Sequence, residues 1–137
     1  MCVDPRITGL TIAVRDQEKA LEFYTTKVGF EKKNDHHVSS SYRYVSVGPR
    51  GQDLELALWQ LGTPDPRGWS HEWKPGTYPP ITIHVDDCRK TFEEMKSRGV
   101  QFKQAQPEEY FMGISAMFSD PDGNDFWIVQ HTAKAFW

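Results

Sequence analysis

Cysteine is scarce in this chain: only Cys2 and Cys88 occur among 137 residues, and they form no Cys-x-x-Cys pair. The sequence therefore excludes a disulfide framework and a cysteine zinc site. Long hydrophobic runs are also missing, since hydrophobic residues make up 38% of the chain and the mean hydropathy is -0.64, so we expect no contact with a membrane. There is no excess of positive charge either, because the net charge is -3, and this argues against a nucleic-acid partner.

The first ten residues contain Asp4 and Arg6 and no apolar segment. We therefore expect no secretory signal peptide and a cytoplasmic location. What the chain does have is aromatic residues, which make up 13% of it and include five tryptophans. So many aromatic side chains in a hydrophilic chain indicate a large core, a ligand site, or both.

The chain contains an internal repeat of about 70 residues. At an offset of 71, Val14-Arg15-Asp16 aligns with Val85-Asp86-Asp87, and at an offset of 72, Asp53-Leu54 aligns with Asp125-Phe126. These matches occur in the same order in both halves with shifts of one residue, so we expect two modules, at about residues 5–61 and 79–131, within a single domain.

Each half has the pattern of a strand, a helix and three further strands. Alternating apolar residues predict the strands, Asp16 and Asp87 are candidate helix N-caps, and Gly29 and Gly99 are candidate helix ends. The expected strands lie near residues 7–14, 30–34, 42–47, 53–60, 81–85, 101–105, 111–119 and 125–130. His36 and His37 would then lie in a polar hairpin connection.

These residues resemble a known family, the vicinal oxygen chelate superfamily of glyoxalase I, bleomycin-resistance proteins and extradiol dioxygenases. The likeness is carried by Thr11–Asp16, by Phe23-Tyr24, by Gly29-Phe30 and by the turn Asp120–Asn124. It implies an α+β fold of two tandem βαβββ modules that form a curved mixed sheet around a cavity, with helices on the convex face. It also implies a homodimer.

Enzymes of this superfamily hold a divalent metal through four strand positions, often as His, Glu, His and Glu. The resemblance places those positions on Gly9, Glu55, Pro80 and Trp127. Only Glu55 has a side chain that binds metals, whereas a catalytic metal generally takes three protein ligands. We therefore expect no metal and no other cofactor at the inherited site.

Strand alternation predicts which residues face the cavity. Leu10, Leu54 and Ile81 fall on the same face as the helices. The opposite face would carry one carboxylate together with aromatic, hydroxyl and imidazole groups, which is the mixture expected of a small-molecule site. Its candidate residues are Glu55, as a general base with a pKa raised by burial, and Thr11, Trp59, Thr82, His84 and Trp127 as ligand-binding residues.

The leading hypothesis is a metal-independent protein that binds a planar or apolar small molecule in the sheet cavity. In one version it sequesters the compound, and in another it is a lyase or isomerase with Glu55 as its general base. The alternative is a metal-dependent lyase or dioxygenase with relocated ligands, Glu55, His84 and His131. A purely structural or interaction domain is a further alternative.

Two segments carry further expectations. The linker, residues 62–78, contains Trp69 and Trp73 and is either a simple connection or a lid over the site. The apolar end Ala135-Phe136-Trp137 is expected to pack on a partner or on its own domain.

Overall fold

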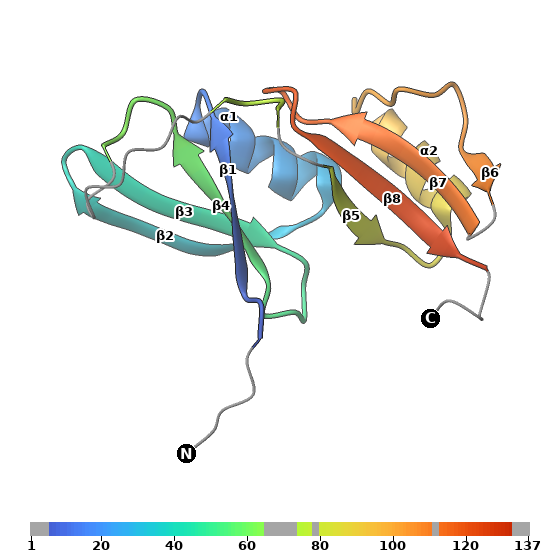
Figure 1. Ribbon diagram of the computed structural model, residues 1–137, viewed down its shortest axis with the longest axis horizontal. Coiled ribbons are helices and arrows are strands. Elements are labelled where there is room, and N and C mark those ends of the chain that lie inside the picture. Colours follow the sequence, from blue (N-terminus) through green and yellow to red (C-terminus); the bar gives the residue numbers. More distant parts are fainter. Residues whose placement is uncertain (1–5, 65–73, 78–79, 111–112, 133–137) are drawn as a thin grey trace, which may run out of the picture. The chain divides into compact units, whose positions relative to one another are not determined.

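The computed structural model describes residues 6–64, 74–77, 80–110 and 113–132. The chain divides into two compact units, Met1–Trp73 and Lys74–Trp137, which we call modules 1 and 2. Each module has its own four-stranded mixed sheet with a helix against one face (Figure 1). The predicted α+β class and the two tandem βαβββ modules are confirmed.

Module 1 has the sheet order β1-β4-β3-β2. Strand β1 runs parallel to β4, and the other neighbouring strands are antiparallel. Its elements are β1 (Gly9–Val14), α1 (Gln17–Glu22), the π-helical segment η1 (Phe23–Val28), β2 (Glu31–Ser39), β3 (Tyr42–Gly48) and β4 (Glu55–Gln60).

Module 2 repeats this arrangement with the order β5-β8-β7-β6, in which β5 is parallel to β8. The only helix among its described residues is longer than α1 and lies along β7 and β8 (Figure 1). Its elements are β5 (Ile81–His84), α2 (Cys88–Ser97), β6 (Glu108–Tyr110), β7 (Gly113–Ser119) and β8 (Asp125–His131).

Two local predictions were wrong. Residues 101–105 were predicted as a strand but form only a single bridge, from Phe102 to Phe118, and the edge strand β6 begins at Glu108. The reason is that Phe102 packs between Phe92 and Phe118. His36 and His37 lie within β2, paired with β3, because the β2–β3 hairpin is longer than predicted. Leu10 lies opposite the buried Leu56, as its predicted face requires, although it is 41% exposed at the sheet edge formed by β1.

Both helices begin in the same way. The Asp16 carboxylate accepts a hydrogen bond from Lys19 N at 3.1 Å, and Asp87 accepts one from Lys90 N at 3.0 Å. These side chains satisfy backbone donors that the first turn of a helix leaves unpaired. Both predicted N-caps are confirmed. Gly29, with φ 92°, follows η1 in the left-handed conformation that glycine adopts without strain.

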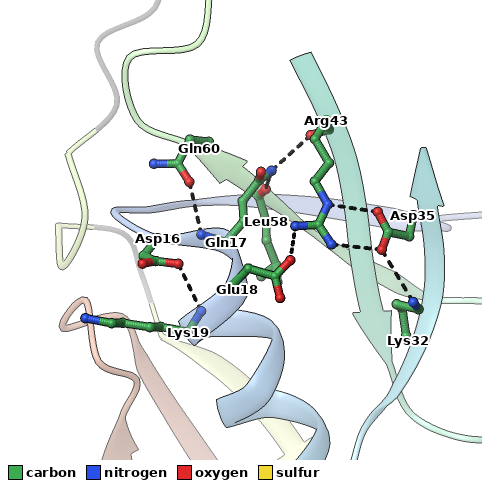
Figure 2. Close-up of polar contacts among 9 residues, drawn as sticks. All are labelled: Asp16, Gln17, Glu18, Lys19, Lys32, Asp35, Arg43, Leu58 and Gln60. Carbon is green, nitrogen blue, oxygen red and sulfur yellow. Dashed lines mark hydrogen bonds and ion pairs between the residues drawn. The ribbon is translucent and has the colours of Figure 1, made fainter. Parts of the chain in front are cut away.

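Polar groups fix α1 to its sheet (Figure 2). The side chain of Gln17 is buried and donates to the carbonyl oxygens of Arg43 at 2.9 Å and Leu58 at 2.8 Å, while its backbone N donates to Gln60 Oε1 at 3.0 Å. A buried amide needs such partners, because an unpaired one costs free energy. The helix start is therefore fastened to both β3 and β4.

An ionic cluster lies beside this amide (Figure 2). The Arg43 guanidinium donates two hydrogen bonds of 2.8 Å to Asp35 and also pairs with Glu18, and Lys32 approaches Asp35 at 3.4 Å. The paired guanidinium holds the pKa of Asp35 well below its usual range, and the hydrogen bond to Asp35 raises the pKa of Arg43. The two-bond geometry makes this a strong charge-assisted contact.

The core of module 2 contains a chain of phenylalanine rings. Phe118 and Phe126 are fully buried and stack with ring centroids 5.2 Å apart. Phe102 contacts Phe118 at 5.7 Å and Phe92 at 4.3 Å, which connects the sheet to α2. The expectation that Phe118 packs in a strand core is confirmed.

The Asp120–Asn124 turn is held together by its own side chains. Asp120 Oδ1 accepts from the backbone N of Asp122 at 2.9 Å and of Asn124 at 2.8 Å, and Asn124 Nδ2 donates to Asp120 Oδ2 at 2.9 Å. Gly123, with φ 84°, supplies the left-handed residue of the turn. The motif that carries part of the resemblance is thus a structural element that joins β7 to β8.

The linker residues Trp69 and Trp73 and the C-terminal Ala135-Phe136-Trp137 lie outside the described residues. All helices within the described residues are too short and too polar to cross a membrane.

Candidate functional site

The face of the module 1 sheet away from α1, which we call the helix-free face, carries the candidates predicted there. Strand register places Gly9 opposite Glu55 and Thr11 opposite Ala57. Thr11 is exposed, Glu55 is partly buried, and Trp59 packs against Tyr42 with ring centroids 5.5 Å apart. These residues share one face because alternate strand residues point the same way.

Glu55 is the centre of a hydrogen-bond network. Ser46 Oγ donates to Oε1 at 2.5 Å and Tyr44 Oη donates to it at 2.9 Å. Asn34 Nδ2 lies 3.1 and 3.2 Å from the two oxygens. Three donors from β2 and β3 therefore converge on one carboxylate of β4, and most of its acceptor capacity at Oε1 is used.

This network contradicts the predicted raised pKa of Glu55. The hydrogen bond from Ser46, foremost, and those from Tyr44 and Asn34 lower the pKa of Glu55, and they outweigh the opposing effect of burial. Burial and the hydrogen bond to Glu55 raise the pKa of Tyr44 to about 12. At neutral pH the pair is therefore a carboxylate that accepts from a neutral phenol.

Module 2 has a cavity of about 440 Å³ on its own helix-free face. Thr82 on β5 lies directly opposite Trp127 on β8, and both line this cavity. Its wall also includes Tyr110, Ser115, Val129 and His131. The volume is within the range of roughly 300–1,000 Å³ typical of small-molecule sites, and apolar and polar groups are mixed as such sites require.

His84 does not line this cavity but contacts His131, which does. The two Nδ1 atoms are 3.1 Å apart, the ring centroids are 4.9 Å apart and the ring planes are inclined at 29° to each other. The relocated-ligand alternative also needs Glu55, which belongs to module 1. Across the described ranges, no three His, Cys, Asp or Glu side chains are grouped to hold a metal ion.

Sequence reasoning missed the partners of Glu55. The pattern Tyr42-Arg43-Tyr44-Val45-Ser46-Val47 places Tyr42, Tyr44 and Ser46 on one face of a strand, and this alternation was available in the sequence. What it lacked was the pairing of strands, because Asn34, Ser46 and Glu55 come from three different strands. Only the sheet brings them together.

A family profile now decides the classification. The profile described as the Glyoxalase/Bleomycin resistance protein/Dioxygenase superfamily matches residues 6–128. The chain belongs to this superfamily. The resemblance drawn from the repeat and the turn motif is confirmed.

Similar proteins match almost the whole chain. YurT, an uncharacterized protein of Bacillus subtilis (strain 168), is 34% identical and the match covers 91% of this chain and 98% of YurT. A solved superfamily member from Sphaerobacter thermophilus DSM 20745 is 36% identical, with a TM-score of 0.79 and coverage of 93% and 98%. TnmS3, described as an antibiotic-binding protein from Streptomyces sp. CB03234, is 30% identical, with a TM-score of 0.78 and coverage of 96% and 100%.

The residues at the superfamily's metal positions do not fit a metal ion. Gly9, opposite Glu55, has no side chain, and Pro80 and Trp127 offer no lone pair to a cation. Glu55, the remaining metal-binding side chain, already accepts hydrogen bonds from three other side chains. No metal-assisted reaction can be assigned to these four positions.

Proposed function

We propose that this protein binds a planar or apolar small molecule without the help of a metal at the superfamily's metal positions. The observation that carries the proposal is the cavity of module 2, about 440 Å³, with Trp127 and Thr82 in its wall. Trp127 replaces a metal-binding carboxylate with a large aromatic surface. Such a side chain favours flat or apolar ligands, because it gains both buried area and ring contacts.

The relatives support a binding role. TnmS3, which is 30% identical to this chain, is described as an antibiotic-binding protein. A planar antibiotic or a similar natural product is therefore the first class of compound to test. Polar cavity groups such as Thr82 and Ser115 would orient it by hydrogen bonds, and Val129 would contact its apolar part.

Glu55 serves in this proposal as a fixed acceptor. Its ionised form holds the phenol of Tyr44, and Oε2 accepts only from Asn34 at 3.2 Å among the hydrogen bonds described for it. A general base must instead take up a proton readily, and the lowered pKa of Glu55 works against that role.

The test is a calorimetric titration of planar aromatic compounds, including antibiotics, in buffer containing EDTA. We expect saturable binding, and Trp127→Ala should weaken it on the order of tenfold or more, because ring contacts and buried area are both lost. Trp59→Ala, at the ligand-binding candidate of module 1, measures whether that module also contributes to binding. Binding that is seen without EDTA but lost in its presence would contradict the proposal, and so would an affinity that Trp127→Ala leaves unchanged.

The enzymatic version has its own outcome. Turnover of a bound compound that is lost in Glu55→Gln while affinity is kept would establish Glu55 as a catalytic base. The homodimer and the cytoplasmic location implied at the outset stay predictions, and sedimentation and cell fractionation test them.

A further inference from the structure

His84 and His131 form a pair in which His131 lines the cavity of the proposed function and His84 does not. Their Nδ1 atoms are 3.1 Å apart on neighbouring parallel strands, β5 and β8. His84 is well exposed, with 58% of its side-chain surface accessible, so an ion from solvent can reach it. We propose that this pair is a binding site for a borderline divalent cation such as Ni²⁺, separate from the superfamily's metal positions.

The distance between the nitrogens suits two ligands of one ion. With metal–nitrogen bonds of about 2.05 Å, a separation of 3.1 Å corresponds to an N–metal–N angle of about 98°. This angle lies between the roughly 90° of neighbouring octahedral or square-planar ligands and the roughly 109° of tetrahedral ones. Imidazole nitrogen is also the ligand that Ni²⁺, Cu²⁺ and Zn²⁺ share.

The tautomers required are accessible. In the neutral pair one Nδ1–H donates to the other Nδ1, so the pair already holds a single proton between its two nitrogens. Metal binding needs both Nδ1 atoms free of protons. The proton on the donor nitrogen therefore moves to Nε2 of the same ring, and no net proton is lost from the neutral pair.

A carboxylate supports this arrangement at His84. Asp86 Oδ1 lies 3.9 Å from His84 Nε2, which is the nitrogen away from the proposed ion. A carboxylate on this side favours a proton on Nε2 and leaves Nδ1 for the metal, as in many carboxylate–histidine–metal sites. Asp86 is fully exposed, so this effect is small.

The site differs from the superfamily's own. His84 and His131 lie four residues after Pro80 and Trp127, the positions that the resemblance assigns to metal ligands in module 2. With only two protein ligands, the other coordination positions would be taken by water. The proposal does not require the ion for ligand binding in the cavity.

The test is calorimetry with Ni²⁺ alone on the full chain. We expect saturable binding, and His84→Ala and His131→Ala should each weaken it by about tenfold or more, since losing a ligand costs at least as much as the roughly 10- to 100-fold typical of a second-shell partner. The matched controls are His36→Ala and His37→Ala, which remove exposed histidines from β2 and should leave the affinity unchanged.

An imidazole ¹H–¹⁵N spectrum with Zn²⁺ gives a second, independent result. Binding should place both rings in the Nε2–H form and shift the Nδ1 signals of His84 and His131. His84→Gln and His131→Gln serve if an alanine variant fails to fold. Equal Ni²⁺ affinity in the paired-histidine variants and the β2 controls, or Nδ1 signals that Zn²⁺ leaves unchanged, would overturn the proposal.

Discussion

Modules 1 and 2 use the same backbone plan for different chemistry. Gln60 Oε1 accepts from Gln17 N in module 1, and Gln130 Oε1 accepts from Cys88 N in module 2, each at 3.0 Å. With the two aspartate N-caps, the helix starts are thus nearly identical. Both modules have buried aromatic rings, and the difference lies in what accompanies them: module 1 adds a buried amide and a partly exposed ionic cluster, whereas module 2 adds a longer chain of phenylalanine rings.

The helix-free faces diverge in the same way. In module 1, Ser46 on β3 pairs with Ala57 on β4 and with Asn34 on β2. In module 2, Ser115 on β7 pairs in the same way with Val129 on β8 and with Glu108 on β6. Glu55 and Trp127 each lie two residues before the β4 or β8 residue of these pairs. The equivalent sets are therefore Glu55, Ser46 and Asn34, and Trp127, Ser115 and Glu108. A hydrogen-bonded carboxylate in one module corresponds to an aromatic cavity wall in the other. The comparison shows that the sheet fixes positions and leaves the chemistry to the side chains.

The largest expected effect tests the aromatic core of module 2. Phe118→Ala should lower the free energy of unfolding by about 3–5 kcal/mol, because it removes a fully buried ring that contacts two others. Urea denaturation followed by circular dichroism measures it. Phe118→Leu, which keeps most of the volume, should cost much less. Equal losses for the two variants would contradict this prediction, because they would mean that the ring contacts, which both variants lose, account for the whole effect.

The ionic cluster of module 1 should give the next largest effect. Arg43→Met should lower stability at neutral pH by about 1.5–3 kcal/mol, because Asp35 and Glu18 lose their shared partner. Asp35 has a lowered pKa in the folded state, so its contribution is present above its unfolded pKa and is lost as the pH falls through the folded value. The difference between Arg43→Met and the parent should therefore shrink in acid. Lys32→Met, which removes an exposed partner at 3.4 Å, is the control with a small effect.

A smaller effect compares the two helix starts directly. Gln17→Leu should cost about 1–2 kcal/mol, since it removes two donors to backbone carbonyls of β3 and β4. Cys88→Ala, at the equivalent place in module 2, should cost less, because its thiol makes only a 3.8 Å contact with the Ile128 carbonyl. Paired denaturation curves check this. A larger loss of stability for Cys88→Ala than for Gln17→Leu would contradict the greater contribution expected from the hydrogen bonds of Gln17.

The smallest effect concerns proton binding at Glu55. A spectrophotometric titration should show a tyrosine with a pKa of about 12 that is absent in Tyr44→Phe, and Glu55→Gln should move this pKa toward the usual 10.0. Because the pKa of Glu55 is lowered from 4.5, its stabilising contribution is present above that value and lost as the pH falls through the folded pKa. Glu55→Gln should therefore flatten the acid side of the stability profile. A Tyr44 pKa that does not change in Glu55→Gln would mean that burial alone raises it.

Much of the fold could be predicted from local patterns. The N-caps Asp16 and Asp87, the glycine after η1 and the alternation of β4 and β8 each depend on a few neighbouring residues. The strand predicted at residues 101–105 failed because Phe102 found better partners in Phe92 and Phe118, far from it in the sequence. Local preference was overridden there by core packing.

The candidate site, like the fold, could be predicted from local sequence only in part. Identity and face could be predicted for Glu55, Trp59 and Trp127, since a period of two assigns a side chain to one side of a strand. The sign of the pKa shift of Glu55 could not, because it depends on donors that the sheet brings from β2 and β3. The contact between His84 and His131 also needs the pairing of β5 with β8.

The sequence by itself determined the two-module plan, the resemblance to the superfamily and the face of β8 on which Trp127 lies. These follow from residue identity and spacing, which folding does not change. The tertiary structure decided that Glu55 is a fixed, ionised acceptor and that two histidines meet at 3.1 Å. The physical reason is that a pKa and a ligand distance depend on atoms that are distant in sequence and become neighbours only in the folded sheet.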